Sequence, residues 1–171
     1  VTLCGTEPTA VRQMMRQPIE VVQRHDLSSL RATVTAGEPW NEDAWLWFFE
    51  HVCGSRIPIL NYGGGTECGG AILIGTFHRP LKPCAFGGPV PGSGADIVDA
   101  EGRPCPPGQM GELVLRLPSI GLTRSLWRDP QRYLENYWQK IPGGWVQGDL
   151  ARRAADGLWY MLGRSDDTLK I

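Results

Sequence analysis

A glycine-rich stretch in the first half of the chain constrains the fold more than any other segment. The apolar run Ile57–Leu60 is typical of a buried strand, and five glycines follow within the eight residues 63–70. Glycine lets a backbone approach a ligand closely, and Thr66 and Glu67 add a hydroxyl and a carboxylate. These oxygens suit a phosphate and its Mg²⁺. The alternative is an ordinary glycine-rich turn, and no Gly-Lys-Ser/Thr follows as in a Walker A loop.

The residues around this stretch alternate between strand and helix patterns. We expect strands at 1–4, 31–35 and 71–75. A helix is predicted from an N-cap at Thr6 to Met15, and a second helix begins with Asn41 as its N-cap. The second helix carries an apolar face, which consists of Ala44, Trp45, Phe48, Phe49 and Val52. The alternation indicates an α/β layer.

Proline and glycine crowd together between residues 80 and 94, which indicates a subdomain boundary. We therefore expect part of an α/β subdomain over 1–80 and a β-rich, barrel-like subdomain over 81–163. Strands are predicted at 95–99, 112–117, 145–147, 150–154 and 158–162. Asp129-Pro130 opens a helix to about Trp138, and Asp156-Gly157 is typical of a two-residue hairpin turn. The fold class is thus mixed α/β and α+β.

Composition narrows the class of protein. The 171 residues include 17 basic and 18 acidic side chains, a net charge of -1, so no basic field indicates nucleic acid as a partner. No apolar run has the length of a membrane span, and the sequence shows no secretory signal. The five cysteines form no Cys-x-x-Cys pair. We therefore expect a cytoplasmic protein with reduced thiols.

The last third of the chain carries a second polar constellation. Gly148-Asp149 is followed by Gly163-Arg164-Ser165-Asp166. An aspartate can accept hydrogen bonds from both hydroxyls of a ribose, and an arginine can donate two to phosphate or ribose oxygens. Taken singly, Asp149 is typical of a turn and Arg164 of a surface cation. As an ordered set with the glycine-rich stretch, they indicate a nucleotide site.

Four blocks in this order resemble the acyl-adenylate-forming superfamily, and most closely its acyl-CoA synthetase branch near acetyl-CoA synthetase. The blocks are Gly37-Glu38-Pro39, Gly65-Thr66-Glu67, Gly148-Asp149 and Gly163-Arg164-Ser165-Asp166-Asp167. The similarity runs nearly end to end. It implies that the chain belongs to the large N-terminal domain of an enzyme that joins a carboxylate to ATP, releases pyrophosphate and then transfers the acyl group to a thiol, usually that of CoA.

The resemblance also implies a role for each matching residue. Thr66 binds the α-phosphate, Glu67 holds Mg²⁺, and Asp149 with Arg164 binds the ribose. Gly65 belongs to the same phosphate block, and the segment Gly37-Glu38-Pro39 lines the adenine pocket. Asp166 is implied as the hinge to a small C-terminal domain, so residues 164–171 are expected to begin that hinge. The acyl pocket would include Ala36 and Gly64, and glycine at 64, where acetyl-specific relatives carry tryptophan, predicts acids longer than acetate.

Two positions depart from the usual pattern. The ring that stacks on adenine usually lies four residues before the glutamate, where this chain has Gly63, and Tyr62 one residue earlier is the substitute. Gln147 replaces the Thr or Ser that usually precedes Gly148.

The resemblance implies that two lysine-bearing elements of the family lie outside this chain, one before Val1 and one after Ile171. We therefore expect the 171 residues to be the central part of a larger synthetase, inactive alone and prone to self-association through uncovered apolar surface. Two alternatives stay open: an adenylation domain that loads a carrier-protein thiol, and a non-catalytic nucleotide-binding module.

Overall fold

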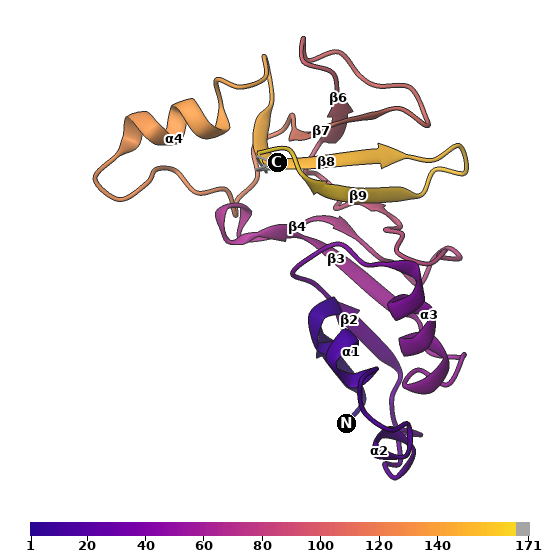
Figure 1. The fold of residues 1–171 in the computed structure, drawn as a ribbon. Coiled ribbons are helices and arrows are strands. Elements are labelled where there is room, and N and C mark those ends of the chain that lie inside the picture. Colours follow the sequence, from indigo (N-terminus) through magenta and orange to yellow (C-terminus); the bar gives the residue numbers. More distant parts are fainter. Residues whose placement is uncertain (167–171) are drawn as a thin grey trace, which may run out of the picture.

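The computed structural model describes residues 1–166, which form two β-sheets with helices on one of them (Figure 1). The first sheet has the strand order β1-β2-β3-β4-β5. Strands β1, β2 and β3 are parallel, whereas β4 and β5 are added antiparallel. The strands of this sheet are β1 (Leu3–Thr6), β2 (Ala32–Thr35), β3 (Ile59–Gly65), β4 (Gly70–Ile74) and β5 (Gly88–Pro89).

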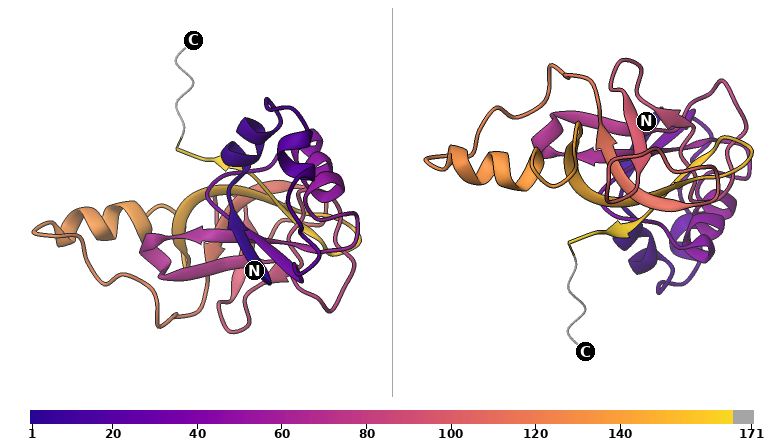
Figure 2. Two further views of the ribbon diagram at one scale, coloured as in Figure 1. Left: turned by 90° about the horizontal axis from the view of Figure 1, so that it is seen from below. Right: turned by 90° about the horizontal axis from the view of Figure 1, so that it is seen from above.

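Three helices lie in the connections between the parallel strands. They are α1 (Pro8–Met14), α2 (Glu20–Gln23) and α3 (Glu42–His51). Val11 of α1 packs with Trp45 and Phe48 of α3 and with Ile59 of β3 in one apolar cluster. Figure 2 shows α1 and α3 together on one side of the sheet. The α/β layer predicted from the alternating pattern is confirmed.

The second sheet is antiparallel throughout, with the order β6-β7-β8-β9. Its strands are β6 (Ala95–Val98), β7 (Met110–Leu115), β8 (Trp145–Arg153) and β9 (Trp159–Arg164). The β-rich second half is confirmed, but within residues 1–166 this sheet stays open and does not close into a barrel.

One long connection carries helix α4 (Pro130–Tyr137) from β7 back to β8. The Asp129 side chain accepts a hydrogen bond of 3.1 Å from the backbone N–H of Arg132, so the predicted helix start is confirmed. The connection projects away from both sheets in the views of Figures 1 and 2. Its base is fixed by Tyr137, whose ring stacks on that of buried Trp145 with centroids 5.3 Å apart.

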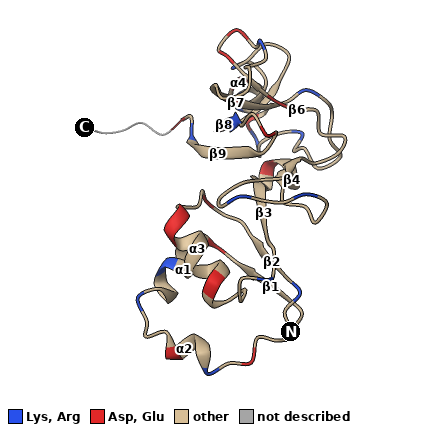
Figure 3. Ribbon diagram, turned by 90° about the vertical axis from the view of Figure 1, so that its right-hand side faces the viewer, with Lys and Arg blue, Asp and Glu red and all other residues tan. Residues whose placement is uncertain are grey.

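The two sheets share an apolar core. Leu73 of β4 and Leu113 of β7 belong to one cluster with Trp145 of β8. The backbones also meet, because Phe86 and Trp159 exchange N–H···O=C hydrogen bonds of 2.8 and 3.1 Å. The junction therefore brings the glycine-rich segment of β3 and β4 next to β8 and β9. Figure 3 shows acidic and basic residues interspersed over both halves of the described chain.

Four local expectations are corrected. The glycine-rich stretch is not a loop, because residues 63–65 continue β3 and pair with β4; only Thr66–Cys68 turn, as a short 3₁₀ helix. Gly148-Asp149 lies inside the continuous strand β8. The Asp156-Gly157 hairpin forms, but its loop has three residues, 155–157, because the N–H of Ala154 bonds to the carbonyl of Leu158.

The fourth correction concerns the helix caps. Thr6 ends β1, and Glu7 takes the N-cap position of α1 without a side-chain hydrogen bond. Asn41 does occupy the N-cap position of α3, but its side chain accepts from Arg12 instead of capping the helix. Part of the expected hinge, residues 167–171, lies outside the described residues. Over residues 1–166, no helix is long and apolar enough to cross a membrane.

Candidate active site

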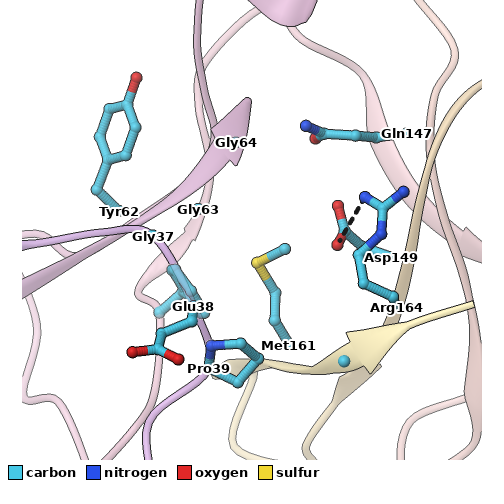
Figure 4. A pocket seen from close by; sticks show the side chains of 12 residues that line it. Gly37, Glu38, Pro39, Tyr62, Gly63, Gly64, Gln147, Asp149, Met161 and Arg164 are labelled. Carbon is cyan, nitrogen blue, oxygen red and sulfur yellow. Dashed lines mark ion pairs between the residues drawn. The ribbon is translucent and has the colours of Figure 1, made fainter. Parts of the chain in front are cut away.

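A cavity of about 360 Å³ lies at the junction of the two sheets. Three segments that are far apart in the sequence line it: the loop after β2, the glycine-rich end of β3, and the facing strands β8 and β9 (Figure 4). The lining residues are Gly37, Glu38, Pro39, Tyr62, Gly63, Gly64, Phe86, Gln147, Asp149, Met161, Gly163 and Arg164. The fold thus brings three of the four sequence blocks, together with Tyr62 and Gly64 of β3, to one cavity.

Asp149 and Arg164 form the charged wall of this cavity. They are register partners on β8 and β9, and Nη1 of Arg164 lies 3.5 Å from Oδ1 of Asp149. Asp149 is buried, and this burial raises the pKa of its carboxyl group, while the charge of Arg164 acts in the opposite direction. Glycine is required at 148, because φ is +97° and an added Cβ would lie 2.7 Å from Nη2 of Arg164.

Asp166 fixes the orientation of the arginine. Its two carboxylate oxygens accept from Nε and Nη2 of Arg164 at 2.8 and 2.7 Å, a bidentate pair. These hydrogen bonds lower the pKa of Asp166. The third guanidinium nitrogen, Nη1, is left to face Asp149. Asp166 itself does not line the cavity.

Side chains of helix α1 form hydrogen bonds with the loop after β2. Oε1 of Glu38 accepts from Nη2 of Arg12 at 2.7 Å and also from the Thr9 hydroxyl. Arg12 donates in addition to Oδ1 of Asn41 at 3.1 Å, so one guanidinium spans the loop. The Thr9 hydrogen bond, followed by the charge of Arg12, lowers the pKa of Glu38. The Glu38 carboxylate therefore fixes the loop to α1 and is not a free charge.

Glu67 lies on the opposite side of the junction, in the 3₁₀ turn. The Tyr137 hydroxyl donates to its Oε1 at 3.5 Å, and the amide of Gln147 donates to its Oε2 at 3.4 Å. Its backbone carbonyl accepts from the N–H of Thr123 at 2.7 Å. Desolvation, together with the neighbouring Glu67 charge, raises the pKa of Tyr137. Both contacts are long, so the carboxylate keeps the capacity to bind a cation.

Gly65 makes room for this arrangement. An added Cβ there would lie 1.9 Å from Nε2 of Gln147 and 2.4 Å from Oε2 of Glu67. Thr66 is exposed and lines an adjoining hollow with Tyr62, Gly64 and Gly65 rather than the cavity itself. Thr66 and Gly65 therefore lie beside the cavity that Gly64 and Tyr62 line.

The two expected acyl-pocket residues do not share one cavity. Ala36 lines a separate hollow with Gly37, whereas Gly64 lines the main cavity. An added Cβ at Gly64 would lie 2.2 Å from the carbonyl oxygen of Gly70. The β4 backbone therefore fills the space into which a side chain at 64 would point.

The environment of Gly63 explains the missing ring. An added Cβ at 63 would meet Sδ of Met161 at 2.4 Å and the ring of Phe86 at 3.0 Å. These two side chains occupy the space of the residue that is absent. Tyr62 lines the same cavity, and in Figure 4 its ring points away from Met161.

The structure adds participants that the sequence did not indicate. Phe86 and Met161 line the cavity, Tyr137 contacts Glu67, and Arg12 holds the Gly37–Pro39 loop through Glu38. Apolar lining residues carry no recognisable sequence signal. Arg12 lies within the helix predicted from Thr6 to Met15, but no local pattern connects it with the loop after β2.

The donor set fits a magnesium ion that is shared with a nucleotide. Among residues 1–166, no three His, Cys, Asp or Glu side chains gather as a metal site. Mg²⁺ is usually bound by one or two carboxylates together with substrate phosphates, so the single carboxylate of Glu67 is compatible with it.

The two-sheet α/β fold matches the N-terminal domain of adenylate-forming enzymes. A family model described as AMP-binding enzyme matches residues 1–127. The chain belongs to this AMP-binding enzyme family.

Individual relatives agree with the family match. The chain is 38% identical over its whole length to an acetyl-coenzyme A synthetase of Pyrobaculum aerophilum and 40% identical to one of Rubrobacter xylanophilus. It covers 26% and 27% of those proteins, so it spans about a quarter of the length of the curated relatives it matches.

Solved structures show the same architecture. An acetoacetyl-CoA synthetase from Streptomyces lividans superimposes with a TM-score of 0.85 and 26% identity, over 99% of this chain and 27% of that one. An anthranilate CoA ligase in complex with anthranoyl-AMP superimposes with a TM-score of 0.82 and 29% identity, over 99% of this chain and 31% of that one.

Proposed function

We propose that this chain is the central part of an ATP-dependent acyl-CoA synthetase. The reaction joins a carboxylate to the α-phosphate of ATP with release of pyrophosphate, and CoA then displaces AMP from the acyl-adenylate. The observation that carries the proposal is one cavity between the two sheets, with the Asp149–Arg164 pair on one wall, the Gly37–Pro39 loop on another and Glu67 beside it.

Each wall supplies one part of nucleotide binding. The loop Gly37-Glu38-Pro39, with Tyr62, receives the adenine. The Asp149 carboxylate accepts from the ribose hydroxyls, and Arg164, oriented by Asp166, adds donors alongside. Thr66 binds the α-phosphate. These assignments follow the family pattern. The cavity shared by the loop residues, Tyr62, Asp149 and Arg164 supports them, and Thr66 lines the adjoining hollow.

Glu67 is the residue that would hold Mg²⁺ with the phosphates. The ion, when bound, supplies positive charge against the charge that develops as pyrophosphate leaves. The protein contributes position: Tyr137 and Gln147 hold the two oxygens of Glu67, and Gly65 lets the Gln147 amide approach.

CoA as the acceptor is favoured over a carrier-protein thiol by the names of the relatives and by the two CoA ligase structures. The full-length protein, given ATP, Mg²⁺ and a panel of carboxylic acids, should release AMP only when CoA is present and should form an acyl-CoA detectable by mass spectrometry. AMP release that needs a carrier protein would favour an adenylation domain that loads a carrier-protein thiol. Absence of any carboxylate-dependent turnover would favour a non-catalytic module.

The acid itself is proposed to be longer than acetate, because glycine stands at position 64. The proposal follows the family pattern, since in this structure the β4 backbone occupies the space toward which a side chain at 64 would point. Comparison of kcat/KM for acetate, butyrate and hexanoate is the measurement. A preference for acetate would contradict the proposal.

Alone, residues 1–171 are proposed to lack turnover, because the family's two lysine-bearing elements are not among them. The described surface carries large apolar side chains that are well exposed, such as Phe77 at 66% and Trp127 at 86%. Such residues favour self-association of the isolated chain. Light scattering tests this, and a stable monomer would contradict it. We further propose that the protein is cytoplasmic. We also propose that the chain divides into two subdomains at about residue 80 and that the hinge to a C-terminal domain begins near Asp166.

A further inference from the structure

Among the described residues that line the cavity, Gln147 has a buried side-chain oxygen without a hydrogen-bond partner. It is only 8% exposed, and its Oε1 has no hydrogen-bond partner. Buried polar atoms in folded proteins are rarely left unpaired, because they have lost water without gaining another partner. An unpaired atom on a cavity wall therefore points to a ligand that supplies the missing partner.

The orientation of the amide follows from its neighbour. Nε2 lies 3.4 Å from Oε2 of Glu67. A carboxylate only accepts hydrogen bonds, so the amide nitrogen must face it and the amide oxygen must face elsewhere. The absent Cβ of Gly65 gives Nε2 its place, since that Cβ would lie 1.9 Å away. Glu67 and Gly65 therefore determine where Nε2 lies, and Oε1 is held on the opposite side of the amide.

The position along β8 identifies the ligand group. Gln147 and Asp149 both line the cavity, on either side of Gly148, where φ is +97° and the pairing of β8 with β7 changes register. Figure 4 shows the Gln147 amide beyond the Asp149–Arg164 pair and away from Pro39 of the adenine loop. Gln147 thus lies between the proposed ribose site at Asp149 and the proposed phosphate site at Glu67. Phosphate oxygens have no proton to donate at neutral pH, whereas ribose hydroxyls do.

We propose that Gln147 is a specificity-determining residue whose Oε1 accepts a hydrogen bond from one ribose hydroxyl of the bound nucleotide, while its Nε2 donates to Glu67. The inference rests on the proposed function, since it needs a nucleotide in this cavity. It makes the ribose contact depend on the amide as well as on Asp149, and it connects the ribose to the residue that would hold the cation.

The test is a thermodynamic cycle between side chain and ligand in the full-length protein. Binding of AMP, 2′-deoxy-AMP and 3′-deoxy-AMP is measured by isothermal titration calorimetry, for the wild type and for Gln147→Met, which keeps the volume and removes the amide. We expect Gln147→Met to bind AMP about 10-fold more weakly, the loss of one hydrogen bond. For one of the two deoxy nucleotides, the ratio of its Kd to that of AMP should fall by about the same factor.

A merely structural role would not change that ratio. Gln147→Thr is the second variant, because its hydroxyl lies two bonds nearer to the strand and should show the same loss of discrimination. Thermal unfolding of both variants establishes that they are folded. Unchanged ratios for both deoxy nucleotides, with AMP still bound by the wild type, would overturn this inference alone. Failure of the wild type to bind AMP would overturn the proposed function as well.

Discussion

The guanidinium of Arg164 lies between two carboxylates, 3.5 Å from Asp149 and paired in bidentate fashion with Asp166 at 2.7 and 2.8 Å. The closer pair is exposed, and the longer contact faces the cavity from a buried carboxylate. Asp166 thus keeps the arginine in place, while Asp149 retains oxygen lone pairs for a ligand. The proposed ribose site is assembled before any nucleotide arrives.

Asp149→Asn should separate binding from stability. Burial raises the pKa of Asp149 above its ordinary value of 3.8, so the folded state binds a proton more readily than the unfolded state. The stability that this proton contributes is present below about pH 4 and is lost as pH rises through the raised pKa. Asparagine removes the buried charge, so the free energy of unfolding of the variant minus that of the wild type should increase from pH 4 upward and then level off.

Chemical denaturation of both proteins between pH 4 and pH 8 checks this sign, and calorimetry with AMP checks the binding. The variant should bind AMP at least about 10-fold more weakly, because a charged acceptor of two hydroxyl groups becomes a neutral one. The assigned burial would be contradicted if the free energy of unfolding of the variant minus that of the wild type were smaller at neutral pH than at pH 4. Unchanged affinity for AMP would mean that Asp149 has only a structural role.

Glu67→Ala should lower the rate of adenylate formation by about 10²-fold or more, since an interaction that stabilises charge in the transition state is removed. The rate should also become nearly independent of Mg²⁺ above the amount needed to complex ATP. Glu50→Ala is the matched control, because Glu50 is exposed on α3, away from the cavity. Near-normal adenylation by Glu67→Ala would contradict the proposed role of Glu67 in binding the metal.

Arg12→Gln should raise the KM for ATP about fivefold and leave kcat almost unchanged. The arginine contacts Glu38 and Asn41 but not the cavity, so its loss loosens the adenine loop by about one exposed charge-assisted hydrogen bond. Arg16→Gln, an exposed change at the end of the same helical segment, is the control. Steady-state kinetics with varied ATP provide the readout, and an equal fall in kcat would point to a general loss of structure.

Gly65→Ala should destabilise the protein by roughly 1–3 kcal/mol, because the new Cβ overlaps Nε2 of Gln147 and Oε2 of Glu67. Gly5→Ala in β1 is the matched change, since its Cβ would meet no atom within 4 Å. Thermal unfolding compares the two. Equal stability would mean that the Gln147 amide moves aside freely, which would weaken its assignment as a fixed group.

The sequence predicted elements better than it predicted the contacts between them. Strand and helix patterns predicted the α/β layer and the β-rich second half, because local apolar periodicity decides both. It missed that residues 63–65 form a strand and that Gly148-Asp149 lies inside β8, because glycine is typical of turns and only sheet pairing overrides that preference.

The candidate site shows the same division. The four blocks could be recognised from their order, and three of them line one cavity. The contact of Gln147 with Glu67 joins residues that are 80 positions apart, and that of Tyr137 with Glu67 joins residues 70 apart. Such contacts arise only when β8 and α4 pack against the end of β3, and no local pattern encodes them.

The most direct test of the central claim is carboxylate-dependent exchange of labelled pyrophosphate into ATP by the full-length protein. This exchange reports reversible formation of an acyl-adenylate and needs no acceptor thiol, so it isolates the chemistry assigned to this cavity. We predict exchange that requires both Mg²⁺ and a carboxylic acid, and that falls by about 10²-fold or more in Glu67→Ala. Absence of exchange with every acid in a panel of short, medium and aromatic carboxylates, from a folded protein that binds AMP, would contradict the account.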